Sequence, residues 1–304
     1  MRRLARGEVN GWLRQRVAAV RSDHFLRRLT LLSGSVAAGQ GFVFLCTPII
    51  SRLYTPEDFG HFATAYSFIL LTGGFGLGNY PKHLPLCRPE EATASLASQL
   101  LVFGAVAIVF VASGLLAGQS LAAALGLELH ALWLTLLAAL LQLVHEPLSY
   151  LLIRDNDFAR YSRQRLLRLF GQGLGQILTG LVVGGTLGLL LGLMVGQLLA
   201  LFSGGRRLVV GLWTLRPRDL AAALPYMRRE WRYPAVVMPA ALLAQYSQAV
   251  VPLLVAMGFG PQPAGMMLLA GRLFLFPIRL LGNTTSQVLL ADLGAADHQT
   301  SRRL

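Results

Sequence analysis

The feature that most constrains this chain is a series of apolar segments, each long enough to cross a lipid bilayer. A transmembrane helix needs about 20 predominantly apolar residues. The segments that qualify are 29–51, 62–80, 93–116, 131–152, 166–184, 187–204, 233–257 and 264–290. Charged residues make up only 13% of the chain, against about 25% in an average soluble domain, so most of the surface must face lipid. We therefore predict an all-α integral membrane protein, a polytopic helical bundle of about eight transmembrane helices.

The fifth and sixth of these segments are joined only by Gly185 and Thr186. A single helix through both would be about 57 Å long at 1.5 Å per residue, which exceeds the thickness of a bilayer. Two spans are therefore predicted. Glycines recur every fourth residue at Gly180, Gly184, Gly188, Gly192 and Gly196, with Gly171 and Gly175 before them. This spacing lets helix backbones approach closely in lipid. Ordinary close packing and a sliding helix pair are both compatible with that pattern.

The distribution of positive charge predicts the orientation of the bundle. The net charge is +13, and loops rich in lysine and arginine face the cytoplasm. If the N-terminus is inside, all lysines and arginines fall in cytoplasmic segments except three. Arg52 lies in an outer loop, and Arg272 and Arg279 lie within the last span. This pattern predicts an N-in, C-in topology. It also excludes nucleic acid as a partner, because the basic residues lie in scattered loops without interleaved aromatic residues.

Polar side chains inside the predicted spans mark the candidate site. An intramembrane arginine is costly and faces the interior of a bundle, and Arg272, Arg279 and Asn283 share one face of the last helix. We predict that they line a cavity for an anionic ligand, to which arginine is suited. The candidate substrate-binding residues are Arg272, Arg279, Asn283, Gln245, Gln248 and Gln40. The alternative is that Arg279 extends to the cytoplasmic surface and Arg272 pairs with Glu146.

His145 and Glu146 lie together in the fourth span and are candidates for a coupling-ion site or for counter-ions. Cys46 and Cys87 give neither a disulfide framework nor metal-ligand spacing. The glycines lack the Gly-Lys-Ser/Thr context of a nucleotide-binding loop. The sequence therefore predicts no catalytic residue, no metal and no cofactor.

Three stretches carry a resemblance to a known family. The first is 34–62, GSVAAGQGFVFLCTPIISRLYTPEDFGHF; the second is 154–176, RDNDFARYSRQRLLRLFGQGLGQ. The third is 234–290, with a Gly-Pro-x-x-x-Gly turn followed by Ala270, Arg272 and Pro277. Together they resemble the polysaccharide-export branch of the multidrug/oligosaccharidyl-lipid/polysaccharide exporter superfamily, the Wzx-type flippases.

The resemblance implies a flippase of the bacterial inner membrane. Its partners would be membrane lipid and an undecaprenyl-pyrophosphate-linked glycan, used for O-antigen of lipopolysaccharide, capsule or exopolysaccharide. Arg272 matches the family pattern for a cationic cavity. The alternatives are a small-molecule or cation antiporter of the same superfamily and a non-transporting membrane scaffold for glycosyltransferases. An integral-membrane enzyme fits least, because the longest predicted outer loop, 117–130, is nearly apolar.

The chain departs from that family in its number of helices. Such flippases usually have twelve or more, so the resemblance implies a C-terminally truncated second lobe, or helices supplied by a second copy or another chain. The expected regions are a basic amphipathic cytoplasmic segment (1–28), a six-helix N-terminal lobe (29–204), a basic cytoplasmic loop (205–232), two helices of an incomplete C-terminal lobe (233–290) and a cytoplasmic tail (291–304).

Overall fold

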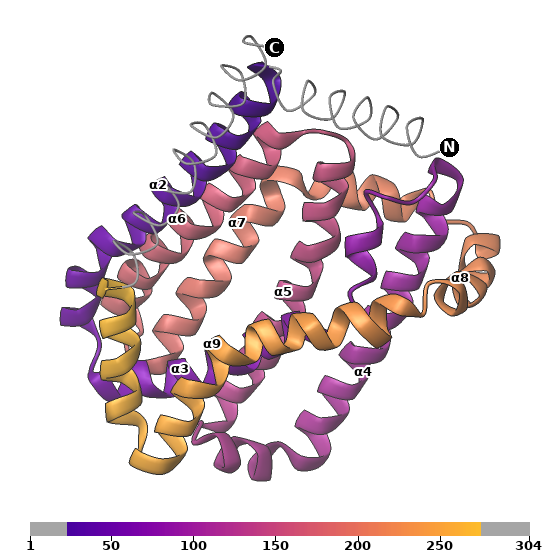
Figure 1. Ribbon diagram of the computed structural model, residues 1–304. Helices are drawn as coiled ribbons and strands as arrows, with labels where there is room; N and C mark the ends of the chain where they lie inside the picture. Colours follow the sequence, from indigo (N-terminus) through magenta and orange to yellow (C-terminus); the bar gives the residue numbers. More distant parts are fainter. Residues whose placement is uncertain (1–22, 275–304) are drawn as a thin grey trace, which may run out of the picture.

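The computed structural model describes residues 23–274, and within that range the chain is helical with short connections and no strand (Figure 1). The main helices are α2 (Asp23–Leu53), α3 (Pro56–Phe75), α4 (Ala92–Leu125), α5 (Leu129–Arg154), α6 (Phe158–Val182), α7 (Gly185–Trp213), α8 (Pro217–Arg229) and α9 (Met238–Phe259). Short 3-10 turns lie at η1 (Tyr80–His83) and η2 (Pro89–Glu91), a π turn at η3 (Tyr233–Val237), and a further helix over 261–274. Most of the predicted segment 1–28 and the whole tail 291–304 lie outside the described residues.

Four of these helices are long and apolar enough to cross a membrane: α4, α5, α7 and the part of α2 over Ser33–Leu53. The helical pieces Tyr233–Tyr246 and Ala249–Phe259 are bent by 50° relative to each other. They make a fifth candidate span if they are counted as one helix. The predicted class, an all-α integral membrane bundle, is confirmed. Helices also occupy the other predicted positions, but α3 and α6, although long enough, are not apolar enough to count as candidate spans. The number of eight spans and the N-in, C-in orientation therefore stay predictions.

Several helices extend beyond the apolar stretches that predicted them. α4 continues to Leu125 through a kink at Ala117, so the predicted outer loop 117–130 is largely helical. The predicted loop 205–232 holds the end of α7 and all of α8. Alanine, leucine and arginine favour helix both inside and outside an apolar stretch. Hydropathy therefore locates the spans better than it locates the ends of the helices.

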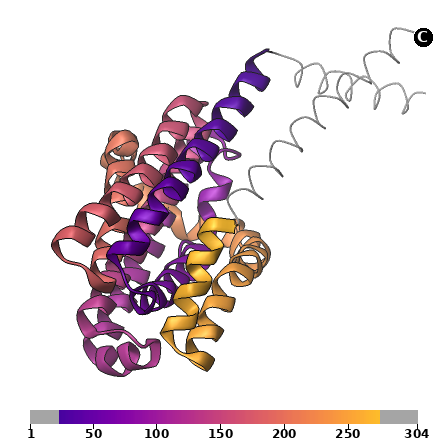
Figure 2. The same ribbon diagram turned by 90° about the vertical axis from the view of Figure 1, so that its left-hand side faces the viewer.

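The chain reverses direction between α6 and α7, as two separate spans require. Gly184 and Gly185 both have positive φ, +66° and +61°, a conformation that glycine adopts without steric cost. The predicted close packing is also confirmed. A Cβ on Gly171 would lie 2.9 Å from the Cα of Gly196, and one on Gly175 would lie 2.9 Å from the carbonyl oxygen of Gly192. α2 packs against α6, so that α2, α6 and α7 form a group of three steeply inclined helices (Figure 2).

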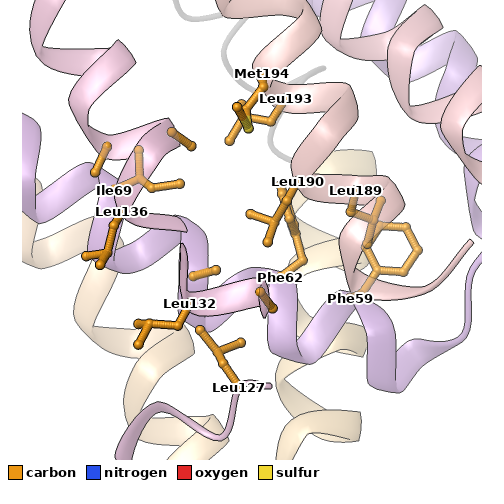
Figure 3. Packing of buried hydrophobic residues seen from close by; sticks show 14 of the residues in the cluster. Phe59, Phe62, Ile69, Leu127, Leu132, Leu136, Leu189, Leu190, Leu193 and Met194 are labelled. Atoms are coloured by element: carbon orange, nitrogen blue, oxygen red, sulfur yellow. The ribbon is translucent and has the colours of Figure 1, made fainter. Parts of the chain in front are cut away.

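A hydrophobic core lies between α3, α5 and α7 (Figure 3). Its labelled members are Phe59, Phe62, Ile69, Leu127, Leu132, Leu136, Leu189, Leu190, Leu193 and Met194. α3 begins at Thr55, whose hydroxyl accepts from the backbone N–H of Asp58, while the Asp58 carboxylate accepts from the backbone N–H of Thr55. This reciprocal cap fixes where α3 starts, and with it the positions of Phe59 and Phe62.

The helices expected to begin a second lobe pack directly on α3. α9 runs beside α3 (Figure 1), with Leu242 and Gln245 against Gly74. The helix 261–274 approaches α3 so closely that a Cβ on Gly265 would lie 2.7 Å from the backbone nitrogen of Gly60. Small residues on both helices permit this contact. It carries Arg272 into the helical bundle.

α8 is fastened to the connection between α3 and α4. The Arg229 guanidinium lies 3.1 Å from the Glu91 carboxylate, and Tyr226 bonds to His83. Asp219, in the first turn of α8, accepts from the backbone N–H of Arg216 and from the hydroxyl of Thr93 at the start of α4. The Arg216 N–H contributes most to holding the pKa of Asp219 below its usual value, with Thr93 and the nearby arginines adding to it.

A pH-dependent stability follows from Asp219. A carboxylate whose pKa is lower in the folded state contributes stability above its unfolded pKa, and loses it as pH falls through the folded pKa. We expect Asp219→Asn to lower the Tm of detergent-purified protein slightly at pH 7, with the difference from wild type closing below about pH 4. Thermal unfolding of both proteins from pH 3 to 8 measures this. Glu90→Gln, at an exposed neighbouring carboxylate, is the control; a gap that stays constant with pH would contradict the assignment.

Candidate substrate site inside the helical bundle

Arg272 lies in the bundle between α3 and α6. Its guanidinium donates a hydrogen bond of 3.2 Å to the side-chain oxygen of Gln176. The guanidinium carbon also lies 5.6 Å from the ring centre of Phe59 and 5.7 Å from that of Phe62. Stacking on aromatic faces is a favourable environment for a desolvated guanidinium. The cation predicted from the sequence is thus inside the bundle, on a wall made by α3 and α6.

Gln176 is held in place by the helices around it. The side chain is fully buried, and its amide donates to the carbonyl of Leu189 on α7 at 3.3 Å. Its own backbone carbonyl accepts from the hydroxyl of Tyr54, at the end of α2, at 2.7 Å. With the amide nitrogen engaged, the side-chain oxygen is left facing Arg272. The orientation of Arg272 therefore depends on contacts from α2, α6 and α7.

A second arginine, Arg168, is also inside the bundle. It donates to the side-chain oxygen of Gln142 at 2.6 Å, and Gln197 on α7 donates to the same oxygen at 3.4 Å. Gln142 lies near the middle of α5, a helix able to span a membrane, so Arg168 lies beside the middle of that helix. Arg168 lies within α6, because this helix begins at Phe158, capped by Asp157, before the apolar stretch. Its predicted cytoplasmic side stays a prediction.

Tyr66 of α3 lies beside the Arg272 site. Its side chain is half-buried, and its ring stacks on that of Phe62 at 5.7 Å between ring centroids. Phe62 in turn lies next to the Arg272 guanidinium. On α6, polar residues recur at every fourth position, Gln164, Arg168, Gln172 and Gln176, and this spacing places them along one face. That stripe is the sequence signal by which Arg168 could have been found.

His145 and Gln164 add to the buried polar side chains around Arg168. Both side chains are buried, and the nitrogen Nε2 of Gln164 lies 3.3 Å from Nδ1 of His145. Among the described residues, the side-chain oxygens of Gln164 and Gln197 have no hydrogen-bond partner. A buried acceptor without a donor is costly, so these oxygens are places where a bound molecule would gain a hydrogen bond.

Glu146 lies on α5 and is half-buried, in the neighbourhood of Lys82 and Tyr150. The structure gives Arg272 a glutamine as its hydrogen-bond partner rather than Glu146. The remaining counter-ion or coupling-ion role of Glu146 stays a prediction.

The other predicted site residues are less central. Gln40 is half-buried on α2, next to Gly39, which packs against Leu169 of α6; Gln245 is half-buried on α9, against Gly74 of α3. Gln248 belongs to α9, but its side chain is not among those described. Arg279 and Asn283 lie outside the described residues.

Comparison with known proteins assigns the family. A family model described as "Polysaccharide biosynthesis protein" matches residues 49–302, which is most of the chain. No curated protein and no solved structure matches. The chain belongs to this polysaccharide biosynthesis family, and its apolar helices make it a membrane protein of that family.

Proposed function

We propose that this protein is a flippase that moves an undecaprenyl-pyrophosphate-linked oligosaccharide across the bacterial inner membrane. The family supports a role in polysaccharide biosynthesis. The cationic cluster supports an anionic substrate handled within the membrane. O-antigen, capsule and exopolysaccharide synthesis each use such a lipid-linked glycan. The proposal includes no catalytic step, metal or cofactor.

The observation that carries this proposal is the pairing of two arginines inside the helical bundle with amides instead of carboxylates. Arg168 is held by Gln142 and Arg272 by Gln176, and neither forms an ion pair with a carboxylate among the residues described. A buried charge without an opposite charge is strongly unfavourable. A bound pyrophosphate would supply the missing negative charge.

Arginine also matches the chemistry of the proposed ligand. The guanidinium presents a planar set of donors that bonds phosphate oxygens in pairs, and it keeps its charge in an apolar environment. Two arginines on separate helices, α6 and 261–274, bring enough positive charge for a pyrophosphate. The glutamines beside them would bond sugar hydroxyls or the phosphate oxygens. A second copy or another chain that contributes further helices remains part of the proposal.

Rescue of surface polysaccharide in a flippase-deficient bacterium tests the proposal. We expect the 304-residue chain to restore the polysaccharide, and Arg272→Ala to abolish that rescue while the same amount of protein inserts into the membrane. Exposed Arg52 provides the control variant, Arg52→Ala. Rescue that is unchanged in Arg272→Ala would remove the cationic site from the mechanism. A stably inserted wild-type chain that gives no rescue would favour the scaffold alternative.

A further inference from the structure

α8 uses one side of its surface to hold the protein together and leaves another side open. Ala223 and Tyr226 are buried against neighbouring helices. By contrast, Leu220 and Leu224, one turn apart on the same edge of the helix, are 40% and 61% exposed. Tyr226 is also the residue that bonds His83. The open edge is thus a surface of α8 that the described protein does not cover.

Two tryptophans mark the ends of this segment. Trp213, the last residue of α7, is 86% exposed, and Trp231, just beyond α8, is 56% exposed. Tryptophan is enriched where a membrane meets water, because its ring is apolar and its N–H is polar. A soluble surface has no reason to display two such side chains around one short helix.

The connectivity places α8 at the membrane boundary. It follows directly on α7, which is long and apolar enough to span, and precedes the bent pair beginning at Tyr233. It is fastened to the N-terminal end of α4, another helix able to span, through Asp219 and Thr93 (Figure 1). Both anchoring points are end regions of helices able to span a membrane, which favours a position of α8 close to the membrane surface.

The charges around α8 are strongly positive. Arg216, Arg218, Arg228 and Arg232 are exposed, and none of them forms an ion pair with a carboxylate in the described part of the chain. Arg229 differs, because it is paired with Glu91 and Glu230. Each arginine close to an anionic membrane surface strengthens binding by about fivefold.

We propose that α8, together with Trp213 and Trp231, is a membrane-surface element that binds anionic phospholipid headgroups. Leu220, Leu224 and the two tryptophans enter the boundary between headgroups and acyl chains, and the arginines contact the phosphates. Because α8 also holds η1, η2 and the start of α4, bound lipid would stabilise this whole side of the bundle. These contacts with the surrounding bilayer do not depend on the proposed transport activity.

Fluorescence quenching by brominated lipids tests the proposal in the full chain. The sequence has four tryptophans, so replacing Trp12, Trp133 and Trp213 with phenylalanine leaves Trp231 as the reporter. The protein is reconstituted in phosphatidylcholine vesicles that contain about one-fifth phosphatidylglycerol, with the bromine carried by either lipid at equal mole fraction. We expect brominated phosphatidylglycerol to quench Trp231 several times more strongly, with a preference of about fivefold for each arginine engaged.

The variant Arg228→Gln/Arg232→Gln is expected to reduce that preference strongly, because these two arginines flank Trp231, and Arg52→Gln, which changes an exposed arginine on another helix, is expected to retain it. If Trp133→Phe reduces folding, the same quantity is obtained by subtracting the signal of Trp231→Phe from that of wild type. Equal quenching by the two brominated lipids would overturn the headgroup preference. Quenching of Trp231 by aqueous acrylamide with no effect of either lipid would overturn the membrane location and leave α8 open to a protein partner.

Discussion

Replacing Arg168 with glutamine is expected to reduce glycan export about tenfold or more, since a hydrogen bond to a charged group contributes about 1.5–3 kcal/mol. Glutamine retains a donor for Gln142 but has no charge to offer a pyrophosphate. Export is measured as surface polysaccharide in the flippase-deficient strain, normalised to the amount of protein in the membrane. The effect is expected in the export rate rather than in folding, because the replaced group is a ligand donor in our proposal.

Arg165→Gln is the matched control for this experiment. Arg165 precedes Arg168 by three residues on α6 but is exposed, where it contacts Tyr161. We expect it to export normally. Arg168→Lys keeps the charge but loses the planar pair of donors, so an intermediate rate is expected. Wild-type export by Arg168→Gln would show that Arg168 is structural and would restrict the site to Arg272.

Gly196→Leu is expected to prevent the packing of α6 on α7. A Cβ at this position would lie 2.7 Å from the backbone nitrogen of Gln172 and closer still to the carbonyl oxygen of Arg168. Backbone atoms cannot move aside as a flexible side chain can, so the helices must separate. The expected loss in the free energy of unfolding is about 3 kcal/mol or more, at the upper end of overpacking effects.

The measurement is the Tm and the elution profile of the detergent-purified protein. Gly104→Leu is the control, because a Cβ on Gly104 meets no atom within 4 Å. We expect this control to match wild type. If Gly196→Leu also matched wild type, the close approach of α6 and α7 in the structure would be contradicted.

The sequence predicted which parts of the chain are helical, because apolar composition and length determine whether a segment enters a membrane. It did not predict where the helices end. α4 and α7 continue past their apolar stretches to Leu125 and Trp213. Their continuations contain no proline, and α4 stops only at Gly126, which adopts the left-handed conformation that ends a helix. Hydropathy contains no information about such extensions.

The site was predicted in part. Arg272 was recognised because an arginine in an apolar segment is unusual. Arg168 was missed because the assignment of basic residues to loops took precedence over the four-residue spacing from Gln164 to Gln176. The partner of Arg272 could not be predicted, since it depends on how the helix 261–274 docks on α3. The small residues Gly60 and Gly265, which permit that docking, are common in any membrane helix.

Transport by the purified protein tests the central claim most directly. The protein is reconstituted in liposomes with a fluorescently labelled undecaprenyl-pyrophosphate-linked sugar, and the fraction of label accessible to an impermeant quencher is followed with time. We expect wild-type protein to move the label between leaflets, whereas Arg272→Ala, inserted in equal amount, behaves like protein-free liposomes. Equal rates for wild type and Arg272→Ala would contradict a substrate site built on the intramembrane arginines.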